Sequence, residues 1–227
     1  MAKEFRKRNG TAMPAEIVLI GGASVLENYG FREATYDVDA IIQASSAMKE
    51  AINAVGDAMG LPANWLNTDF IKTASYTPKL LEHSVYYRTF SNIMTVRTVR
   101  DEYLIAMKLM SGRKYKYDLS DVIGILMEHE KSGNPITMAQ IDTAMHKLYG
   151  GWDAVPPESR PFIENVLAER DFEAQYVRIR NEEQGNKEIL VDFDKNYPGQ
   201  LKGEKIDSIL KSARARRQHE EQDRDSQ

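Results

Sequence analysis

This sequence of 227 residues lacks several features, and each absence excludes a class of protein. It has no cysteine, which excludes a disulfide scaffold, a thiolate metal site and a cysteine nucleophile. It has no apolar run near the ~20 residues that a membrane span needs. The basic N-terminus, MAKEFRKRNG, is followed by no apolar segment of the secretory type. We therefore expect a cytoplasmic protein with no membrane partner.

The sequence also lacks a large excess of either charge. A net charge of −4 argues against wholesale coating of nucleic acid, although a local basic patch is compatible with it. Hydrophobic residues make up 42% and charged residues 28% of the chain, which is typical of a soluble globular protein. The length suits one large domain, or a domain with an appendage.

The most informative stretch covers residues 17–42 and reads IVLIGGASVLENYGFREATYDVDAII. Its four opening apolar residues predict a strand buried on both faces. Gly21 and Gly22 follow, and Ser24 with Glu27 three residues later predicts the start of a helix. A glycine turn that opens a helix offers close backbone approach, free amide donors and the positive end of the helix dipole. All three suit a phosphate group.

Two acidic residues follow on the next predicted strand. Asp37 and Asp39 are separated by one residue, so in a strand both carboxylates point to the same face. Like charges side by side repel each other unless a cation lies between them. We expect a hard dication with oxygen ligands here, Mg²⁺ or alternatively Mn²⁺, which can bridge phosphate oxygens in an in-line displacement.

Each half of this pattern also has a structural interpretation. The glycine pair with Ser24 could be an ordinary capped turn, and the two aspartates could lie on a solvated strand edge. Their joint occurrence in this order and spacing favours a nucleoside-triphosphate site.

Gly21-Gly22-Ala23-Ser24 followed by Asp37-Val38-Asp39 resembles the signature of the DNA polymerase β-type nucleotidyltransferase superfamily. The intervening Arg32-Glu33-Ala34-Thr35 resembles the R-x-x-T of the bacterial branch that contains the AbiEii-type toxins of toxin–antitoxin and phage-defence systems. The resemblance covers about the first 130 residues. It implies metal-dependent transfer of a nucleoside monophosphate from a triphosphate to tRNA or a protein, with an antitoxin as a further partner.

The resemblance also implies roles for individual residues. Asp37 and Asp39 would hold the metal, and Gly21, Gly22 and Ser24 the phosphates. Arg32 and Thr35 belong to the implied nucleotide-binding set, where Arg32 could assist or could tie the loop to the sheet.

A polar loop around Trp65-Leu66-Asn67 also resembles this family. We expect Asn67, or alternatively Asp69, beside the nucleotide pocket. In an equally compatible interpretation, Trp65 and Phe70 fix the loop to the core and the polar residues cap a turn.

Residues 84–100 favour two strands with a turn at Ser91-Asn92. Polymerase β-like enzymes usually carry a third carboxylate on such a strand, but no acidic residue occurs between Glu82 and Asp101. This departure leaves open a catalytically weak, nucleotidyltransferase-like module that binds nucleotide or regulates a partner.

A second motif begins with a predicted helix that Asp101 caps and whose one internal basic residue is Lys108. A lysine is almost never fully buried without a partner, so Lys108 either reaches solvent along its stem or meets an anion such as a triphosphate. A helical lysine, a basic loop at 113–117 and Asp118-Leu119-Ser120-Asp121 again resemble the AbiEii-type branch.

The two aspartates of this motif share the polar side of the helix that they begin. As structural groups, Asp118 would be an N-cap and Asp121 would complement the helix dipole. The resemblance implies that one of them also pairs with Lys108 or acts as a base. Arg113 and the tyrosines of its loop could hold triphosphate or an RNA acceptor through charge and stacking, or could form a solvated turn.

Elsewhere the periodicity predicts helices near 47–59, after Thr137 and near 157–169, whereas residues 171–203 are mixed. The four histidines are too scattered for a zinc motif, so each is expected to be structural or exposed.

The predicted fold is α+β. A small mixed β-sheet core with helices occupies residues 14–130, preceded by an N-terminal arm at 1–13 that is either a short lead-in helix or a loose segment. A helical C-terminal region follows at 131–203, and a charged helix and tail at 204–227. A Rossmann-type dinucleotide or methyl-donor protein is disfavoured, because no G-x-G-x-x-G occurs and the acids arrive as a pair on the next strand.

Overall fold

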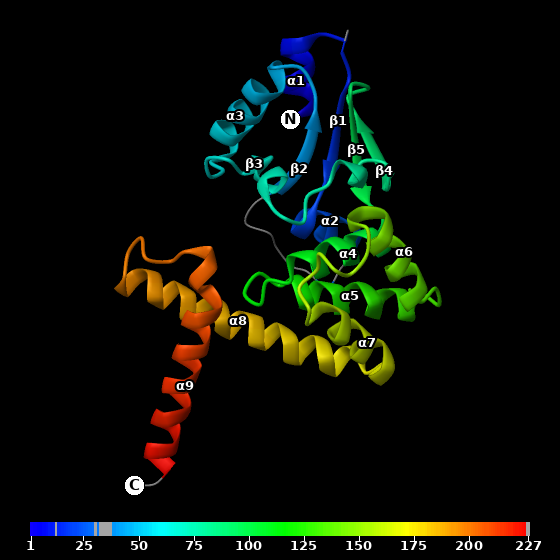
Figure 1. Ribbon diagram of the computed structural model, residues 1–227. Helices are drawn as coiled ribbons and strands as arrows, with labels where there is room; N and C mark the ends of the chain where they lie inside the picture. Colours follow the sequence, from blue (N-terminus) through cyan, green and yellow to red (C-terminus); the bar gives the residue numbers. More distant parts are fainter. Residues whose placement is uncertain (12, 30, 32–37, 226–227) are drawn as a thin grey trace.

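The structure is a computed structural model that describes residues 1–11, 13–29, 31 and 38–225, with the side chains of 204 and 216–225 excepted. It has the predicted α+β fold, a mixed five-stranded sheet with helices, including helices in the C-terminal region (Figure 1). The strands are β1 (Ala15–Leu19), β2 (Val38–Gln43), β3 (Leu66–Asn67), β4 (Ser84–Phe90) and β5 (Met94–Val99).

The strand order is β3-β2-β1-β5-β4. The central strand β1 runs antiparallel to β2 and parallel to β5. The hairpin of β4 and β5 turns at Ser91 and Asn92, which both have φ of +52°. Such a two-residue turn with positive φ matches the twist of the flanking strands, and the predicted turn is confirmed.

The described helices are α1 (Ala2–Asn9), α2 (Gly21–Asn28), α3 (Ala47–Met59), α4 (Asp101–Ser111), α5 (Asp118–Lys131), α6 (Met138–Tyr149), α7 (Ser159–Glu169), α8 (Phe172–Asn196) and α9 (Ile206–Asp225). Three short 3₁₀ segments are η1 (Asp69–Lys72), η2 (Pro78–Leu80) and η3 (Gly203–Lys205). Over the described chain, no helix combines the length and the apolar character that crossing a bilayer requires.

The two faces of the sheet are covered by different helices. On one face α1 and α3 pack on Ile17 and Ala40 in a small apolar cluster. On the other face Val18 and Ile41 belong to a large cluster that includes α2 and extends through α4 to α8. This alternation of neighbouring strand residues between two cores explains why β1 reads as a continuous apolar run.

The N-terminal segment belongs to the first of these layers. Residues 2–9 form α1, which agrees with the lead-in helix and not with the loose arm among the two alternatives for residues 1–13. This helix packs against α3, and Phe5 is fully buried. Phe5 is the largest buried side chain of this helix, and Ala2 is buried beside the same cluster.

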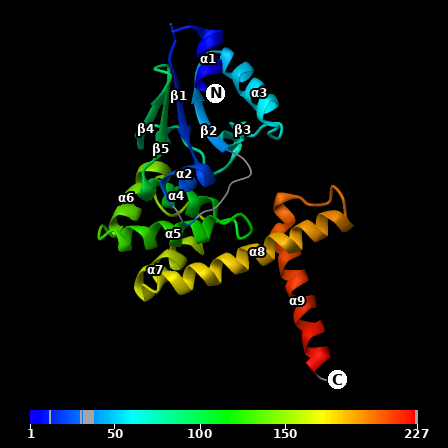
Figure 2. The same cartoon turned by 180° about the vertical axis from the view of Figure 1, so that it is seen from behind.

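The largest difference from prediction is α8, a helix of 25 residues where mixed structure was expected. Its buried positions include Gln175, Glu183 and Asn186, so the side that packs on the protein is partly polar and its apolar periodicity is interrupted. It passes beneath α5 and α7, and α9 projects away from the body in both views (Figures 1 and 2).

Phe5→Ala tests whether α1 is part of the core. We expect the free energy of unfolding in urea to fall by about 3–5 kcal/mol, the usual cost of removing a buried phenylalanine. Met13→Ala is the control, because Met13 is exposed, and it should change stability by less than about 0.5 kcal/mol. Equal effects of the two substitutions would contradict the assignment of α1 to the core.

Candidate functional site

A small cavity lies where the first turn of α2 meets β2 and the facing ends of α4 and α5. Its lining includes six residues that the sequence singled out: Gly21, Gly22, Asp39, Lys108, Arg113 and Asp118. The predicted glycine turn and one of the two predicted carboxylates therefore share one cleft, together with residues of the second motif.

The glycine turn approaches the carboxylate closely. Gly21 has φ of +58°, and a Cβ placed on it would lie 3.8 Å from Oδ2 of Asp39. The two strands fix this approach, because the Ile20 N–H donates to the Asp39 carbonyl at 3.0 Å. Since α2 begins at Gly21, the unpaired amides of its first turn lie at this cavity. The site therefore has the amide donors that an anion requires.

Ser24 lies elsewhere. Ile20 is the N-cap of α2 and no side chain caps this helix, so the predicted capping role of Ser24 is wrong. The reason is that α2 starts four residues earlier than the capping pattern suggested, since its N-cap is Ile20 and not Ser24, which places Ser24 within the helix. Its side chain is fully buried, and its hydroxyl has no hydrogen-bond partner among the described residues. The structure does not bring Ser24 to the cavity.

Three other predicted site residues, Arg32, Thr35 and Asp37, lie outside the described residues. Their assignments stay predictions. Of the predicted pair of metal ligands, only Asp39 has a described position.

The second motif forms a buried ion-pair cluster. The Lys108 ammonium lies 3.2 Å from Asp118 Oδ1 and 2.7 Å from Asp121 Oδ2, and all three side chains are at most 3% exposed. Asp118 and Asp121 do share one side of α5, as predicted, but that side faces the protein. Tyr117 is the N-cap, so the predicted capping role of Asp118 is wrong because its carboxylate is bound to cations instead.

Electrostatics keep Asp118 ionised. Burial alone would raise the pKa of its carboxyl group, but the charges of Lys108 and Arg113 outweigh burial and lower the pKa below its usual value. Asp118 is therefore a weak base. Its contacts fit an anchoring role better than proton transfer.

Arg113 is the more accessible cation of the site. Its Nε donates to Asp118 Oδ2 at 2.8 Å, and its side chain is 39% exposed. Burial tends to lower the pKa of this guanidinium, but the charge of Asp118 and the weaker influence of Asp39 raise it. Arg113 therefore stays charged between the two carboxylates, with Lys116 also lining the cavity.

The tyrosines of the 113–117 loop contact the C-terminal helices. Arg180 lies 3.5 Å above the ring of Tyr117, whose hydroxyl bonds to Gln184. Tyr115 packs on the small apolar cluster between α8 and α9. Both rings therefore already have partners on α8 or α9, which disfavours the stacking interpretation of this loop.

The start of α5 is held by Glu183 of α8. Its carboxylate accepts from the Leu119 N–H at 2.9 Å and from the Ser120 N–H at 3.3 Å. Burial raises the pKa of Glu183 to about 7, and the nearby negative charge of Asp118 acts in the same direction, although the hydrogen bonds oppose it. The protonation state of Glu183 on α8 therefore affects its hydrogen bonds to the start of α5, which forms one wall of the cavity.

The predicted residues of the polar loop serve a local turn. Asn67 lies beside Asp39 in the pairing of β3 with β2. However, its side-chain oxygen accepts from the Asp69 N–H at 2.8 Å, and Asp69 pairs with Lys72 at 2.7 Å. Both residues border a separate groove against α3. The structure therefore agrees with the turn-capping interpretation.

The donors available at the cavity suit a metal only in combination with a substrate. No three His, Asp or Glu side chains of the described chain come close enough together to form a metal site. Mg²⁺ is usually held by one or two carboxylates together with substrate phosphates. Asp39 fits as one such ligand, and Asp37 is its partner in the sequence alone.

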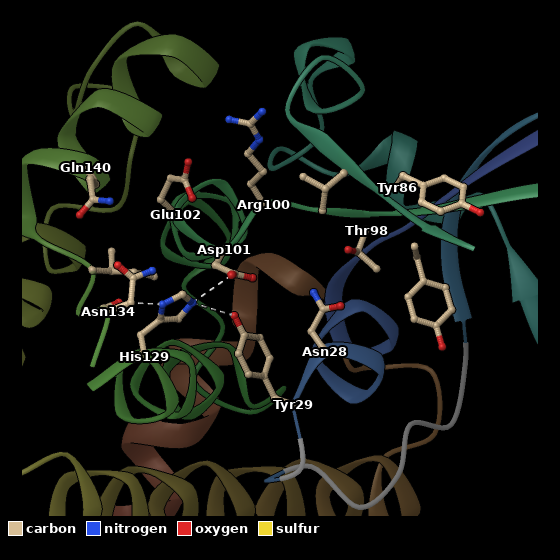
Figure 3. A pocket seen from close by; sticks show the side chains of 13 residues that line it. Asn28, Tyr29, Tyr86, Thr98, Arg100, Asp101, Glu102, His129, Asn134 and Gln140 are labelled. Carbon is tan, nitrogen blue, oxygen red and sulfur yellow. Dashed lines mark hydrogen bonds and ion pairs between the residues drawn. The ribbon is translucent and has the colours of Figure 1, made fainter. Parts of the chain in front are cut away.

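A second and larger cavity, of about 470 Å³, was not anticipated from the sequence. It lies at the other end of α2 and includes His129, Tyr29 and Asp101 (Figure 3). The sequence predicted that His129 is structural or exposed, whereas the structure places it in the lining of this cavity, bonded to Asp101. No sequence pattern predicts these neighbours, because Tyr29, Asp101 and Asn134 come from three separate parts of the chain.

Comparisons with models of protein families, with curated proteins and with solved structures gave no match to this chain. A functional assignment therefore depends on the residues and their geometry.

Glu183→Gln tests the link between α8 and the cavity. Glu183 keeps its proton up to about pH 7 in the folded protein but releases it near 4.5 when unfolded. Folding therefore takes up a proton between these values, and this contribution to stability is lost as the pH rises from about 4.5 to 7. Relative to the variant, the wild type should lose up to about 3 kcal/mol of unfolding free energy over this range.

The measurement is urea unfolding at several pH values. Glu173→Gln is the control, since Glu173 is an exposed residue of the same helix, and its curve should follow that of the wild type. A constant difference between wild type and Glu183→Gln across the range would contradict the raised pKa.

Lys108→Met tests whether the buried lysine holds α4 and α5 together. Removing one partner of a buried ion pair leaves an uncompensated charge, so the free energy of unfolding should fall by about 3–5 kcal/mol. Lys72→Met removes an exposed pair and should cost less than about 1 kcal/mol by the same urea measurement. A Lys108 variant as stable as the wild type would refute the structural role.

Proposed function

We propose that this chain is a metal-dependent nucleotidyltransferase of the DNA polymerase β type. It would move a nucleoside monophosphate from a nucleoside triphosphate to an acceptor and release pyrophosphate. The observation that carries the proposal is the 3.8 Å approach of the Gly21 position to the Asp39 carboxylate, in a cavity that Arg113 and Lys116 also line.

The phosphate end of the nucleotide would occupy the cavity. Amides at the start of α2 and the guanidinium of Arg113 are the anion-binding groups. The enclosed space is about 70 Å³, far below the ~300–1,000 Å³ of pockets that enclose a whole ligand. The sugar and base would therefore lie outside the enclosed part.

Charge balance favours metal dependence. Lys108 and Arg113 are already paired with Asp118 and Asp121, so they leave little net positive charge for a triphosphate. Asp39 adds a further negative charge at the same place. Asp39 and, from the sequence, Asp37 would hold the Mg²⁺ or Mn²⁺, which when bound would offset phosphate charge and orient the oxygens for displacement.

The reaction forms a bond between an acceptor hydroxyl oxygen and the α-phosphorus. It breaks the bond from that phosphorus to the oxygen that leaves with pyrophosphate, and the hydroxyl proton passes to solvent. In this scheme Lys108 is a positioning residue, because it fixes Asp118, which in turn holds Arg113 at the cavity. This differs from the sequence-based interpretation in which Lys108 meets the triphosphate directly.

A second candidate function is a nucleotide-binding or regulatory module of the same fold with little turnover. It is favoured by β5, the strand next to β1, whose sequence MTVRTV contains no acidic residue. A site with Asp37 and Asp39 alone could bind a metal–triphosphate complex without completing a two-metal centre.

The biological setting is proposed from the resemblance alone. The AbiEii-like motif residues suggest a toxin of a toxin–antitoxin or phage-defence system, acting in the cytoplasm on tRNA or a protein and inhibited by an antitoxin.

Asp39→Asn tests the enzyme against the module. The purified protein is incubated with each labelled triphosphate, Mg²⁺ and total tRNA or protein extract, and label transfer is measured. Loss of a metal ligand should lower transfer at least about 100-fold, since even residues that only support ligands are worth 10–100-fold. Asp153→Asn, at an exposed aspartate, should transfer label like the wild type.

The outcomes separate the two candidates. Metal-dependent binding of triphosphate without label transfer would favour the module. If the wild type neither binds triphosphate nor transfers label, both candidates fail.

A further inference from the structure

The 470 Å³ cavity has a rigid polar floor (Figure 3). Nε2 of His129 lies 2.9 Å from Asp101 Oδ2 and 3.3 Å from the Tyr29 hydroxyl, and its Nδ1 lies 3.0 Å from the Asn134 carbonyl oxygen. Both ring nitrogens therefore face oxygen atoms, and the imidazole cannot turn without losing contacts. Burial, and then the charge of Asp101, raise the pKa of Tyr29, so its hydroxyl stays neutral.

One wall of the cavity is formed by adjacent aromatic side chains of β4. Tyr86 and Tyr87 both line it, although neighbours in a regular strand point to opposite faces. The pairing of β4 with β5 is irregular between Tyr86 and Arg88, and such a bulge re-aims side chains. Tyr86 is 61% and Tyr87 39% exposed, so their rings are available to a ligand.

The rim carries groups that can read a base edge or contact a phosphate. The side-chain amides of Asn28 and Asn134 offer both a donor and an acceptor (Figure 3). The guanidinium of Arg100 is exposed at the same rim, and Arg88 is exposed on β4. The acidic residues of the same lining are Asp101, which is bonded to His129, and Glu102.

We propose that this cavity binds unpaired bases of single-stranded RNA. Unpaired bases stack on aromatic rings and hydrogen-bond through their exposed edges to amide side chains, whereas stacked bases in a duplex cannot enter. An extended peptide added to the edge of β4 is disfavoured, because the bulge interrupts the row of backbone groups that would pair with it. The role of this RNA as the acceptor of the transfer reaction rests on the proposed function. Binding of the RNA to the cavity does not.

The test is fluorescence anisotropy with labelled single-stranded RNA decamers, without triphosphate and with a chelator present. The wild type should bind the single strands and bind the matching duplex at least tenfold more weakly. Tyr86→Ala should weaken binding roughly 5- to 150-fold, the range for loss of one stacked base. Tyr197→Ala removes a comparably exposed tyrosine at the end of α8 and should leave binding unchanged.

Salt dependence and cross-linking locate the contact. Arg100→Ala should reduce the slope of log K against log salt concentration by about 0.7, the value for one phosphate contact on a single strand. Ultraviolet cross-links should map to residues 84–90. Cross-links confined to the 113–117 loop or to α9 would overturn the proposal.

Three other results would also overturn it: no binding by the wild type, equal binding of duplex and single strand, or equal losses in Tyr86→Ala and Tyr197→Ala. The proposal would also be overturned if an extended peptide protected the backbone amides of β4 from hydrogen exchange while RNA did not bind. Asp39→Asn should bind RNA like the wild type, because Asp39 lies in the other cavity. RNA binding without nucleotide transfer by the wild type would therefore reject the enzyme and retain the RNA site.

Discussion

The arrangement of this site depends on one buried interaction, the contact of the Lys108 ammonium with the carboxylates of Asp118 and Asp121. Lys108 lies on α4 and both acids lie on α5, so the interaction fixes the ends of two helices against each other. It also leaves Asp118 as the partner of Arg113, which brings a guanidinium to the cavity. A cluster of this kind is expensive to bury and is strongly destabilised by the loss of one member.

The other wall of the cavity has a backbone origin. The antiparallel pairing of β1 and β2 places the end of one strand beside the start of the other, and the positive φ of Gly21 turns the chain directly into α2. Any side chain at that position would point toward Asp39. The turn from strand to helix beside this carboxylate therefore favours glycine, because only glycine adopts such a positive φ without strain.

Local signals predicted much of the fold and part of the site. The apolar run of β1, the turn of the hairpin at Ser91 and Asn92, and Thr137 at the start of α6 lie within a few residues of the elements they define, so they could be recognised in the sequence. The polar packing face of α8 could not be recognised in the sequence, because Glu183 and Asn186 are buried by partners more than 60 residues away. Ser24 was misplaced since a capping pattern does not distinguish the first helical turn from the second.

The two cavities lie at opposite ends of α2, with Gly21 in the lining of one and Asn28 in the lining of the other. Seven residues of α-helix span roughly 10 Å, and a helix of this length does not stretch. Ligands bound at both places would therefore be held at a constant separation. A polymer bound at Tyr86 and Tyr87 would reach the glycine turn only if its end extended a fixed distance beyond the bound segment. The length of that single-stranded end would then decide which polymers can occupy both cavities.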